Sequence, residues 1–183
     1  LAWGELELTL LDTPGHVDFS AEMERTLQVL DCAVLVLSGA DGVQSHTRTL
    51  WRLLRDYQVP TFLFVNKMDL PGADRAALLE QLQSQLDEGC LDFSCGLEPL
   101  WEELAARDEE LLERYVAGEA LSVADAAALA DRRLIFPCLF GSALKLEGVD
   151  ELLDAQERYT LAPRDPGQLA ARVHKVTPEG GER

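Results

Sequence analysis

Three short polar stretches follow apolar runs and carry residue types that could bind a ligand. They span residues 12–16, 66–69 and 141–144. Parallel strands place their carboxyl ends on one edge of a sheet, which is where open α/β sheets bind ligands. If the three apolar runs are parallel strands, we expect the three stretches to lie on one edge and to form one site.

The first stretch begins with the carboxylate of Asp12. Residues 8–11 before it form a continuous apolar run with one threonine, which is typical of a fully buried parallel strand. At the mouth of a site, the Asp12 carboxylate could reach Mg²⁺ directly or through water. Gly15 has no Cβ, so its amide could approach an anion closely. Alternatively, Asp12 only caps the helix that follows.

The second and third stretches suit recognition of a nucleotide base. The carboxylate of Asp69 could accept hydrogen bonds from two adjacent N–H groups, which guanine presents and adenine does not. Asn66 could donate to a ring nitrogen and tie its loop to the neighbouring one. The aliphatic stem of Lys67 could lie across the base plane. The Ala143 amide would then meet the guanine carbonyl oxygen, with Ser142 shaping the turn. Taken singly, both stretches are also common turn compositions.

The apolar pattern between these stretches alternates between strand and helix. Strand-like runs occur at residues 1–11, 33–37, 61–65 and 134–140, and helical spacing at residues 17–30, 47–57, 75–86 and 149–159. Strands that alternate with helices of this length predict an α/β fold with a parallel, doubly wound sheet.

Two regions depart from this alternation. Residues 89–133 are helical and acidic, and we interpret them as a subdomain inserted at one edge of the sheet. Its charge cluster is either a solvated face or a surface for a partner. Residues 162–167 are linker-like, and residues 169–176 alternate as an antiparallel edge strand would. The expected apolar seam of the inserted subdomain is Trp101, Leu104, Leu111, Leu112 and Tyr115.

Composition excludes several classes of function. The 183 residues have a net charge of −17, which argues against a basic face for nucleic acid, so no direct DNA binding is expected. No apolar run could span a membrane, and no signal-peptide pattern opens the sequence. The cysteines and histidines have no zinc-ligand spacing. Cys32 and Cys138 lie in strand-like runs, which suits buried thiols and a cytoplasmic location. Leu1 already lies in strand-like sequence, so we expect a longer parent protein.

Together, the three stretches resemble the motifs of the translational GTPases. The DTPGH, NKMD and GSAL sequences match, in order, the motifs for metal and γ-phosphate, for guanine specificity and for support of the base. The runs at residues 16–31, 41–54 and 141–152 extend the match to the elongation factor G class. Residues 108–115 and 136–143 look most like the tetracycline-resistance ribosomal protection proteins.

The resemblance implies a P-loop NTPase-type sheet that binds GTP or GDP with Mg²⁺ and hydrolyses GTP on the ribosome. Asp12 would hold the Mg²⁺ shell, the Gly15 amide would touch the γ-phosphate, and His16 would orient the attacking water. Residues 1–162 would be a partial GTP-binding domain, and residues 163–183 a linker and the first strand of a β-barrel domain. The nucleotide-binding residues would be Asp12, Thr13, Pro14, Gly15, Asn66, Lys67, Asp69, Ser142, Ala143 and Leu144.

One departure from the family limits this expectation. The sequence contains no GxxxxGK[ST] phosphate loop, and the switch threonine is also missing. The family places both before Leu1, and it places the phosphate-loop strand between the strands that end at Asp12 and Ser38. We therefore expect a truncated sheet that lacks its central strand, either closed up or left open.

Two functions remain in view. These residues alone would be inactive as an enzyme, and the alternative to a GTPase fragment is a non-enzymatic interaction module that lost catalysis. His16 directly after Gly15 favours the enzyme, because a protein that had lost catalysis would not need this histidine. An ATP-dependent enzyme on the same fold conflicts with Asp69.

Overall fold

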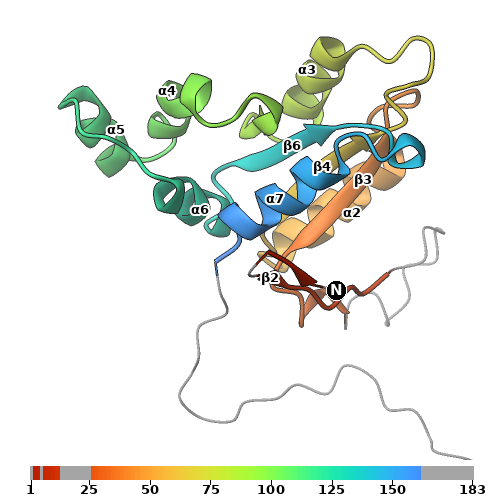
Figure 1. Ribbon diagram of the computed structural model, residues 1–183, viewed down its shortest axis with the longest axis horizontal. Helices are drawn as coiled ribbons and strands as arrows, with labels where there is room; N and C mark the ends of the chain where they lie inside the picture. The colour runs from red at the N-terminus through yellow and green to blue at the C-terminus, as the bar shows by residue number, and fades with distance from the viewer. Residues whose placement is uncertain (1, 5, 13–25, 162–183) are drawn as a thin grey trace, which may run out of the picture.

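The computed structural model describes residues 2–4, 6–12 and 26–161. Its centre is a four-stranded sheet in the order β3–β4–β6–β5, and each neighbouring pair is parallel. The strands are β3 (Ala33–Ser38), β4 (Thr61–Asn66), β6 (Phe136–Phe140) and β5 (Cys90–Asp92). Figure 1 shows them with helices on both faces. The predicted α/β fold with a parallel sheet is confirmed.

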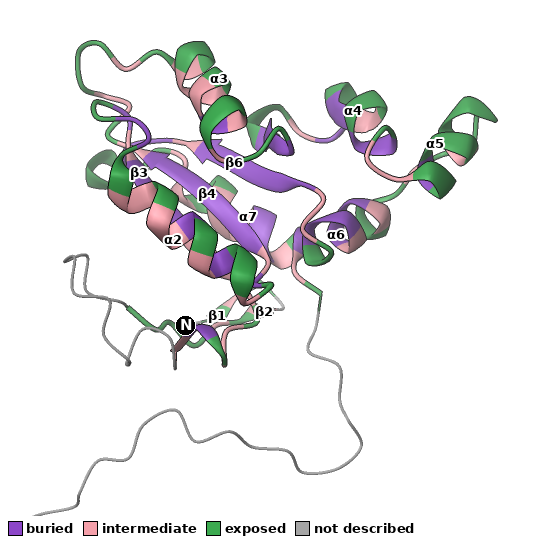
Figure 2. Cartoon of the chain, turned by 180° about the vertical axis from the view of Figure 1, so that it is seen from behind, coloured by how far each residue is buried: buried purple, intermediate pink, exposed green. Residues whose placement is uncertain are grey.

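Two apolar clusters lie on the two faces of the sheet, and the alternation along β4 separates them. Phe62 and Phe64 belong to one cluster, with α6 (Val123–Asp131) and α7 (Val149–Tyr159). Leu63 and Val65 belong to the other, with α2 (Ser45–Asp56) and α3 (Arg75–Gln85). A strand buried on both faces must be apolar at every position, which explains the continuous hydrophobic run. Figure 2 shows the buried strands behind α2.

The helical region after β5 differs in part from the expectation. Residues 90–92 form an edge strand of the main sheet, so the irregular helical segment starts after Asp92. It contains two 3₁₀ turns (Phe93–Cys95 and Glu98–Leu100), α4 (Trp101–Ala105), α5 (Glu109–Val116) and α6.

The predicted apolar seam of this region is partly wrong. Leu104 and Leu111 are buried, whereas Leu112 and Tyr115 are exposed. Adjacent residues on a helix point about 100° apart, so Leu111 and Leu112 cannot face the same seam. Leu129 of α6 contributes to the seam instead, in one cluster with the sheet and α7.

The start of the chain does not form the predicted buried strand. β1 (Ala2–Trp3) and β2 (Leu6–Glu7) form a separate antiparallel pair, and the Trp3 Nε1–H donates to Asp154 Oδ1 of α7 at 2.8 Å. Residues 8–12 are not a strand, and Leu10 is 83% exposed. β3 is consequently an edge strand of the described sheet, and its Val36 is 58% exposed. In the described part of the chain, β3 pairs with a strand on one side only, that of β4.

Several expectations concern residues outside the described ranges. They are Thr13–His16, residues 17–25 of the helix predicted over 17–30, and residues 163–183 with their predicted strand. No helix in the described ranges is long and apolar enough to cross a membrane.

Candidate functional site

Asn66 joins the ends of three strands at the carboxyl edge of the sheet. It is the last residue of β4, and its carbonyl oxygen accepts from the Gly39 amide just beyond β3 at 2.7 Å. Its side-chain Oδ1 accepts from the amides of Lys67 at 2.8 Å and of Ala143, beyond β6, at 2.9 Å. The predicted meeting of the second and third stretches is therefore observed. We call residues 66–69 and 142–144 the two base loops, after the role that the sequence predicts for them.

Asp69 is held mostly out of solvent in its ionised form. Its side chain is 15% exposed, and its Oδ2 lies 3.8 Å from the Lys145 ammonium. The Ser142 hydroxyl is buried and makes no hydrogen bond of ordinary geometry within the described residues, but it lies close enough to stabilise the carboxylate charge. It is the largest of the influences that lower the pKa of Asp69, and Lys145 adds to it. An ionised carboxylate is an acceptor only, as recognition of two N–H groups requires.

Lys67 adopts an unusual backbone conformation. Its φ is +64°, in the left-handed backbone region that residues other than glycine rarely adopt. Such strain persists where surrounding contacts hold it, and it concentrates at functional sites. Here the Lys67 amide is held by the Asn66 side chain, and the Lys67 side chain is exposed. The turn therefore presents a solvent-facing lysine stem beside Asp69.

The second base loop is a tight ring closed by its own backbone. Ser142 and Glu147 exchange two backbone hydrogen bonds, of 2.9 and 3.0 Å. A Cβ on Gly141 would lie 2.1 Å from the Glu147 carbonyl oxygen, so the ring closes only around glycine. At its tip, Leu144 is 90% exposed. The ring thus holds an apolar side chain at the surface next to Asn66.

The hydrogen-bond acceptor of the Ala143 amide differs from the expected one. The sequence assigns it to the guanine carbonyl oxygen, but in this structure it donates to Asn66 Oδ1. The Asn66 NH₂ group has no acceptor among the described residues. The sequence assigns this group to a ring nitrogen of the base.

Asp12 does not join this site. It is exposed, and residues 8–12 lie outside the sheet, so the expectation that a strand of this sheet ends at Asp12 is wrong. Among the described residues, 8–12 are not part of any strand or sheet. The rest of the first stretch lies outside the described residues. Within the described ranges no group of acidic, histidine or cysteine side chains could hold a metal ion.

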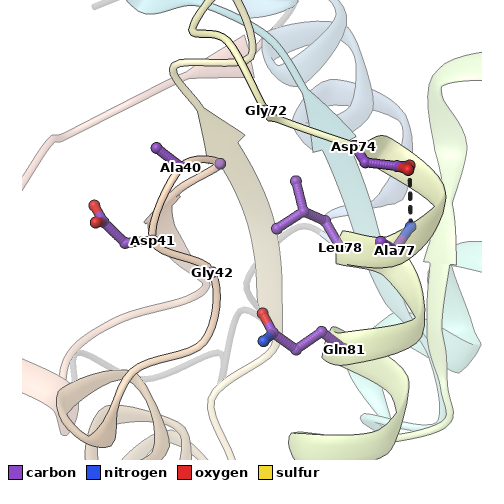
Figure 3. Close-up of a pocket in the computed structure, with 9 residues that line it drawn as sticks. Ala40, Asp41, Gly42, Gly72, Asp74, Ala77, Leu78 and Gln81 are labelled. Carbon is purple, nitrogen blue, oxygen red and sulfur yellow. Dashed lines mark hydrogen bonds between the residues drawn. The ribbon is translucent and has the colours of Figure 1, made fainter.

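A shallow hollow of about 190 Å³ lies between the β3–α2 loop and the first half of α3 (Figure 3). Leu78 and Gln81 point toward the loop, and Gln81 Oε1 accepts from the Val43 amide at 2.8 Å. Asp74 points instead toward the start of α3, where it caps the helix through Ala76 and Ala77. Ligand pockets usually enclose about 300–1,000 Å³, so this hollow is too small for a nucleotide.

Sequence reasoning missed two contributors to the site. Gly39 ties β3 to Asn66, and Lys145 pairs with Asp69. In the sequence, Gly39 is only one of several turn-forming residues after the strand-like run at 33–37. Lys145 follows Leu144 directly, so a lysine beside an expected base contact was the available signal.

Comparison with known proteins identifies relatives for most of the chain. The family model described as the elongation factor Tu GTP binding domain matches residues 1–162. The tetracycline resistance protein TetO of Streptococcus pneumoniae is 31% identical over 192 residues, covering 95% of this chain and 30% of that protein. TetW of Butyrivibrio fibrisolvens is 36% identical over 170 residues, covering 84% of this chain and 26% of that protein. The chain thus spans less than a third of the length of these relatives.

A solved structure supports the fold. The crystal structure of ttk003000868 from Thermus thermophilus superposes with a TM-score of 0.73 at 23% identity, over 82% of this chain and 30% of that chain. At this identity the likeness concerns the fold alone.

Proposed function

This chain belongs to the elongation factor Tu GTP-binding domain family, and from that premise we propose that it is the guanine-reading part of a ribosome-dependent GTPase of the ribosomal protection type. The observation that carries the proposal is the tie between the base loops, in which Asn66 Oδ1 accepts from the Ala143 amide beside the ionised Asp69. This arrangement lets side chains from two distant segments face one planar base.

The chemistry of the loops favours guanine over adenine. The Asp69 carboxylate would accept from the ring N–H and the exocyclic amine of guanine, whereas adenine would turn a ring nitrogen lone pair toward it. Asn66 would donate its NH₂ group to a ring nitrogen. The Lys67 stem and the exposed Leu144 would cover the two faces of the base, and Ser142 and Ala143 would hold the second loop in place.

Hydrolysis in the complete protein would depend on the stretch that begins at Asp12. By the family resemblance, Asp12 would hold the Mg²⁺ shell through water, the Gly15 amide would meet the γ-phosphate, and His16 would orient the attacking water on the ribosome. Thr13 and Pro14 would shape this turn. Phosphoryl transfer depends on such positioning and on charge neutralisation more than on covalent chemistry.

The open edge of β3 supports the expectation about the phosphate loop. The family places a further strand between β3 and the strand that ends at Asp12. In the described sheet that side of β3 has no neighbouring strand, and the β3 residue Val36 is 58% exposed. A strand carrying a phosphate loop would fill this edge of the sheet.

The second candidate is an interaction module that reads guanine without hydrolysis. It would need only the base loops, in which Asn66 Oδ1 accepts from the Ala143 amide, and no phosphate loop. Phosphates are normally held by loop amides, a lysine and Mg²⁺, and each hydrogen bond to a charged group contributes about 1.5–3 kcal/mol. Without three such bonds, affinity falls by more than about a thousandfold.

Titration of the 183-residue chain with guanosine, GDP, GTP and adenosine, followed by NMR, tests the base assignment. We expect weak binding of guanosine, no gain from added phosphates because the chain has a net charge of −17, and no binding of adenosine. Equal binding of adenosine and guanosine would refute guanine reading.

The enzymatic assignment is tested in the complete protein. His16→Ala should leave GTP affinity unchanged and lower ribosome-stimulated hydrolysis by about 10²-fold or more. Unchanged hydrolysis at saturating ribosomes would remove His16 from the mechanism. Protection of translation from tetracycline, measured with the same protein in the cytoplasmic extract of a sensitive strain, would separate the ribosomal protection role from translocation.

A further inference from the structure

Arg75 connects three elements, α3, β5 and β6, and two of them adjoin the base loops in the sequence: α3 follows residues 66–69, and β6 precedes residues 142–144. It is the first residue of α3, and its backbone therefore ends the segment that follows Asn66–Asp69. Its guanidinium donates from Nε to Asp92 Oδ2 and from Nη2 to Asp92 Oδ1, both at 2.6 Å, at the end of β5. The same guanidinium lies 4.9 Å from the centre of the Phe140 ring, at the end of β6.

Phe140 controls where the second base loop begins. The next residue, Gly141, donates its amide to the Val65 carbonyl at 2.9 Å and accepts from the Met68 amide at 3.0 Å. The position of β6 at this point therefore sets the separation between Ala143 and Asn66. A side chain that holds Phe140 relative to α3 also holds one base loop relative to the other.

The geometry of the Arg75–Asp92 pair is specific to arginine. A planar guanidinium can bind both oxygens of a carboxylate and also stack on a ring, which an ammonium cannot do. Asp92 is oriented independently, because its Oδ1 also accepts from the Ser94 amide at 3.0 Å. The side chains of Arg75 and Asp92 are 41% and 21% exposed, so the pair adds little to overall stability. We therefore expect the pair to act mainly on the relative position of α3, β5 and β6.

We propose that Arg75 is a positioning residue for base recognition, which keeps the two base loops in register by bridging Asp92 and Phe140. This inference rests on the proposed guanine-binding function. Without the guanidinium, the ends of β6 and α3 move relative to each other, and the contact between Asn66 and Ala143 opens more often.

The test measures amide hydrogen exchange in the 183-residue chain by NMR. In Arg75→Met, which keeps the aliphatic stem, exchange of the Ala143 and Met68 amides should rise about tenfold relative to the amide of Leu63 in the sheet centre. Arg75→Lys should give an intermediate value, because it keeps the charge without the planar fork. Guanosine affinity, measured in parallel, should fall with the loss of loop register.

The matched control is Arg114→Met. Arg114 makes a similar double contact with Asp125, at 2.8 and 3.3 Å, but it joins α5 to α6 in the inserted region. This variant should leave the exchange of the Ala143 and Met68 amides unchanged. If Arg75→Met does not fold, Asp92→Asn breaks the same pair while keeping an oxygen for the Ser94 amide.

The outcomes separate this inference from the proposed function. If Ala143, Met68 and Leu63 accelerate by the same factor, Arg75 acts only on overall stability and the inference is overturned. The inference is also overturned if Arg75→Met leaves the exchange of Ala143 and Met68 relative to Leu63 unchanged. The same holds if Arg114→Met raises this relative exchange as much as Arg75→Met does. If the parent chain binds no guanosine, the proposed function fails, while the exchange ratios still decide whether Arg75 sets the loop register.

Discussion

The side-chain oxygen of Asn66 accepts a hydrogen bond from the Ala143 amide at 2.9 Å, across 77 positions of sequence. This contact joins the two base loops into one surface. Because the same oxygen also accepts from the Lys67 amide, Asn66 fixes both the local turn and the distant loop. The predictions that follow test this arrangement and its supports.

Asp69→Asn should change base preference in the complete protein. The carboxylate accepts two N–H groups, and an amide would set a donor against one of them, so GTP affinity should fall by about tenfold or more. Xanthine presents a carbonyl at that position and should gain affinity. Competition between GTP and XTP measures both effects.

Asp74→Asn is the matched control for this change. Asp74 lies in the same connection but caps α3 through the amides of Ala76 and Ala77, and asparagine caps equally well. It should leave both nucleotide affinities unchanged. If Asp69→Asn behaved like Asp74→Asn, the specificity assignment would be wrong.

Two substitutions at Asn66 should separate loop structure from base contact. Asn66→Asp keeps an oxygen for the amides of Lys67 and Ala143 but removes the NH₂ donor, so the chain should stay folded and lose guanosine affinity. Asn66→Ala removes both and should also lower the free energy of unfolding by about 1–2 kcal/mol. Urea unfolding and guanosine titration of both variants measure the difference, and equal stability loss in the two would contradict it.

Gly141→Ala should disrupt the ring of the second base loop. The added Cβ would lie 2.1 Å from the Glu147 carbonyl oxygen, a backbone atom, so the paired hydrogen bonds between Ser142 and Glu147 must open. We expect a loss of at least about 2 kcal/mol in unfolding free energy. Gly118→Ala provides the comparison, because Gly118 has φ +78° but open space around its Cβ, and it should cost about 1 kcal/mol. Equal losses in urea unfolding would show that steric closure of the ring is not the cause.

Stability of the inserted helices should depend on pH through Asp125. The Arg114 guanidinium is the largest influence that lowers its pKa, and Ser122 adds to it. A lowered folded-state pKa gives stability that is complete above the unfolded value of about 3.9 and is lost as pH falls through the folded value. Asp125→Asn should therefore lower the melting temperature at pH 7, and the gap to the parent should close below about pH 4.

Asp131→Asn serves as the control for that experiment, because Asp131 is an exposed carboxylate at the end of the same helix. It should not lower the melting temperature at pH 7. A gap between Asp125→Asn and the parent that stays constant down to pH 2.5 would exclude the ion pair as the source of the pH dependence.

Much of the fold was predictable because its signals are local. The apolar runs at 33–37 and 61–65 and the helical spacing at 75–86 and 149–159 depend on contacts along one element, and the structure places elements there. The base loops were predictable for a related reason. A polar tip directly after a buried parallel strand emerges at the carboxyl edge of the sheet, which placed Asn66 and Ser142 on the same edge, and the pairing of β4 with β6 brings them together.

Only the tertiary structure decided which strands have partners and which helix face is buried. Residues 8–11 have the composition of a buried strand, yet they are not part of any strand or sheet among the described residues. Leu112 and Leu111 are equally apolar, but only Leu111 meets the seam from α4 and α6. The bridge from Arg75 to Asp92 and Phe140 likewise joins separate elements, which no local pattern in the sequence encodes.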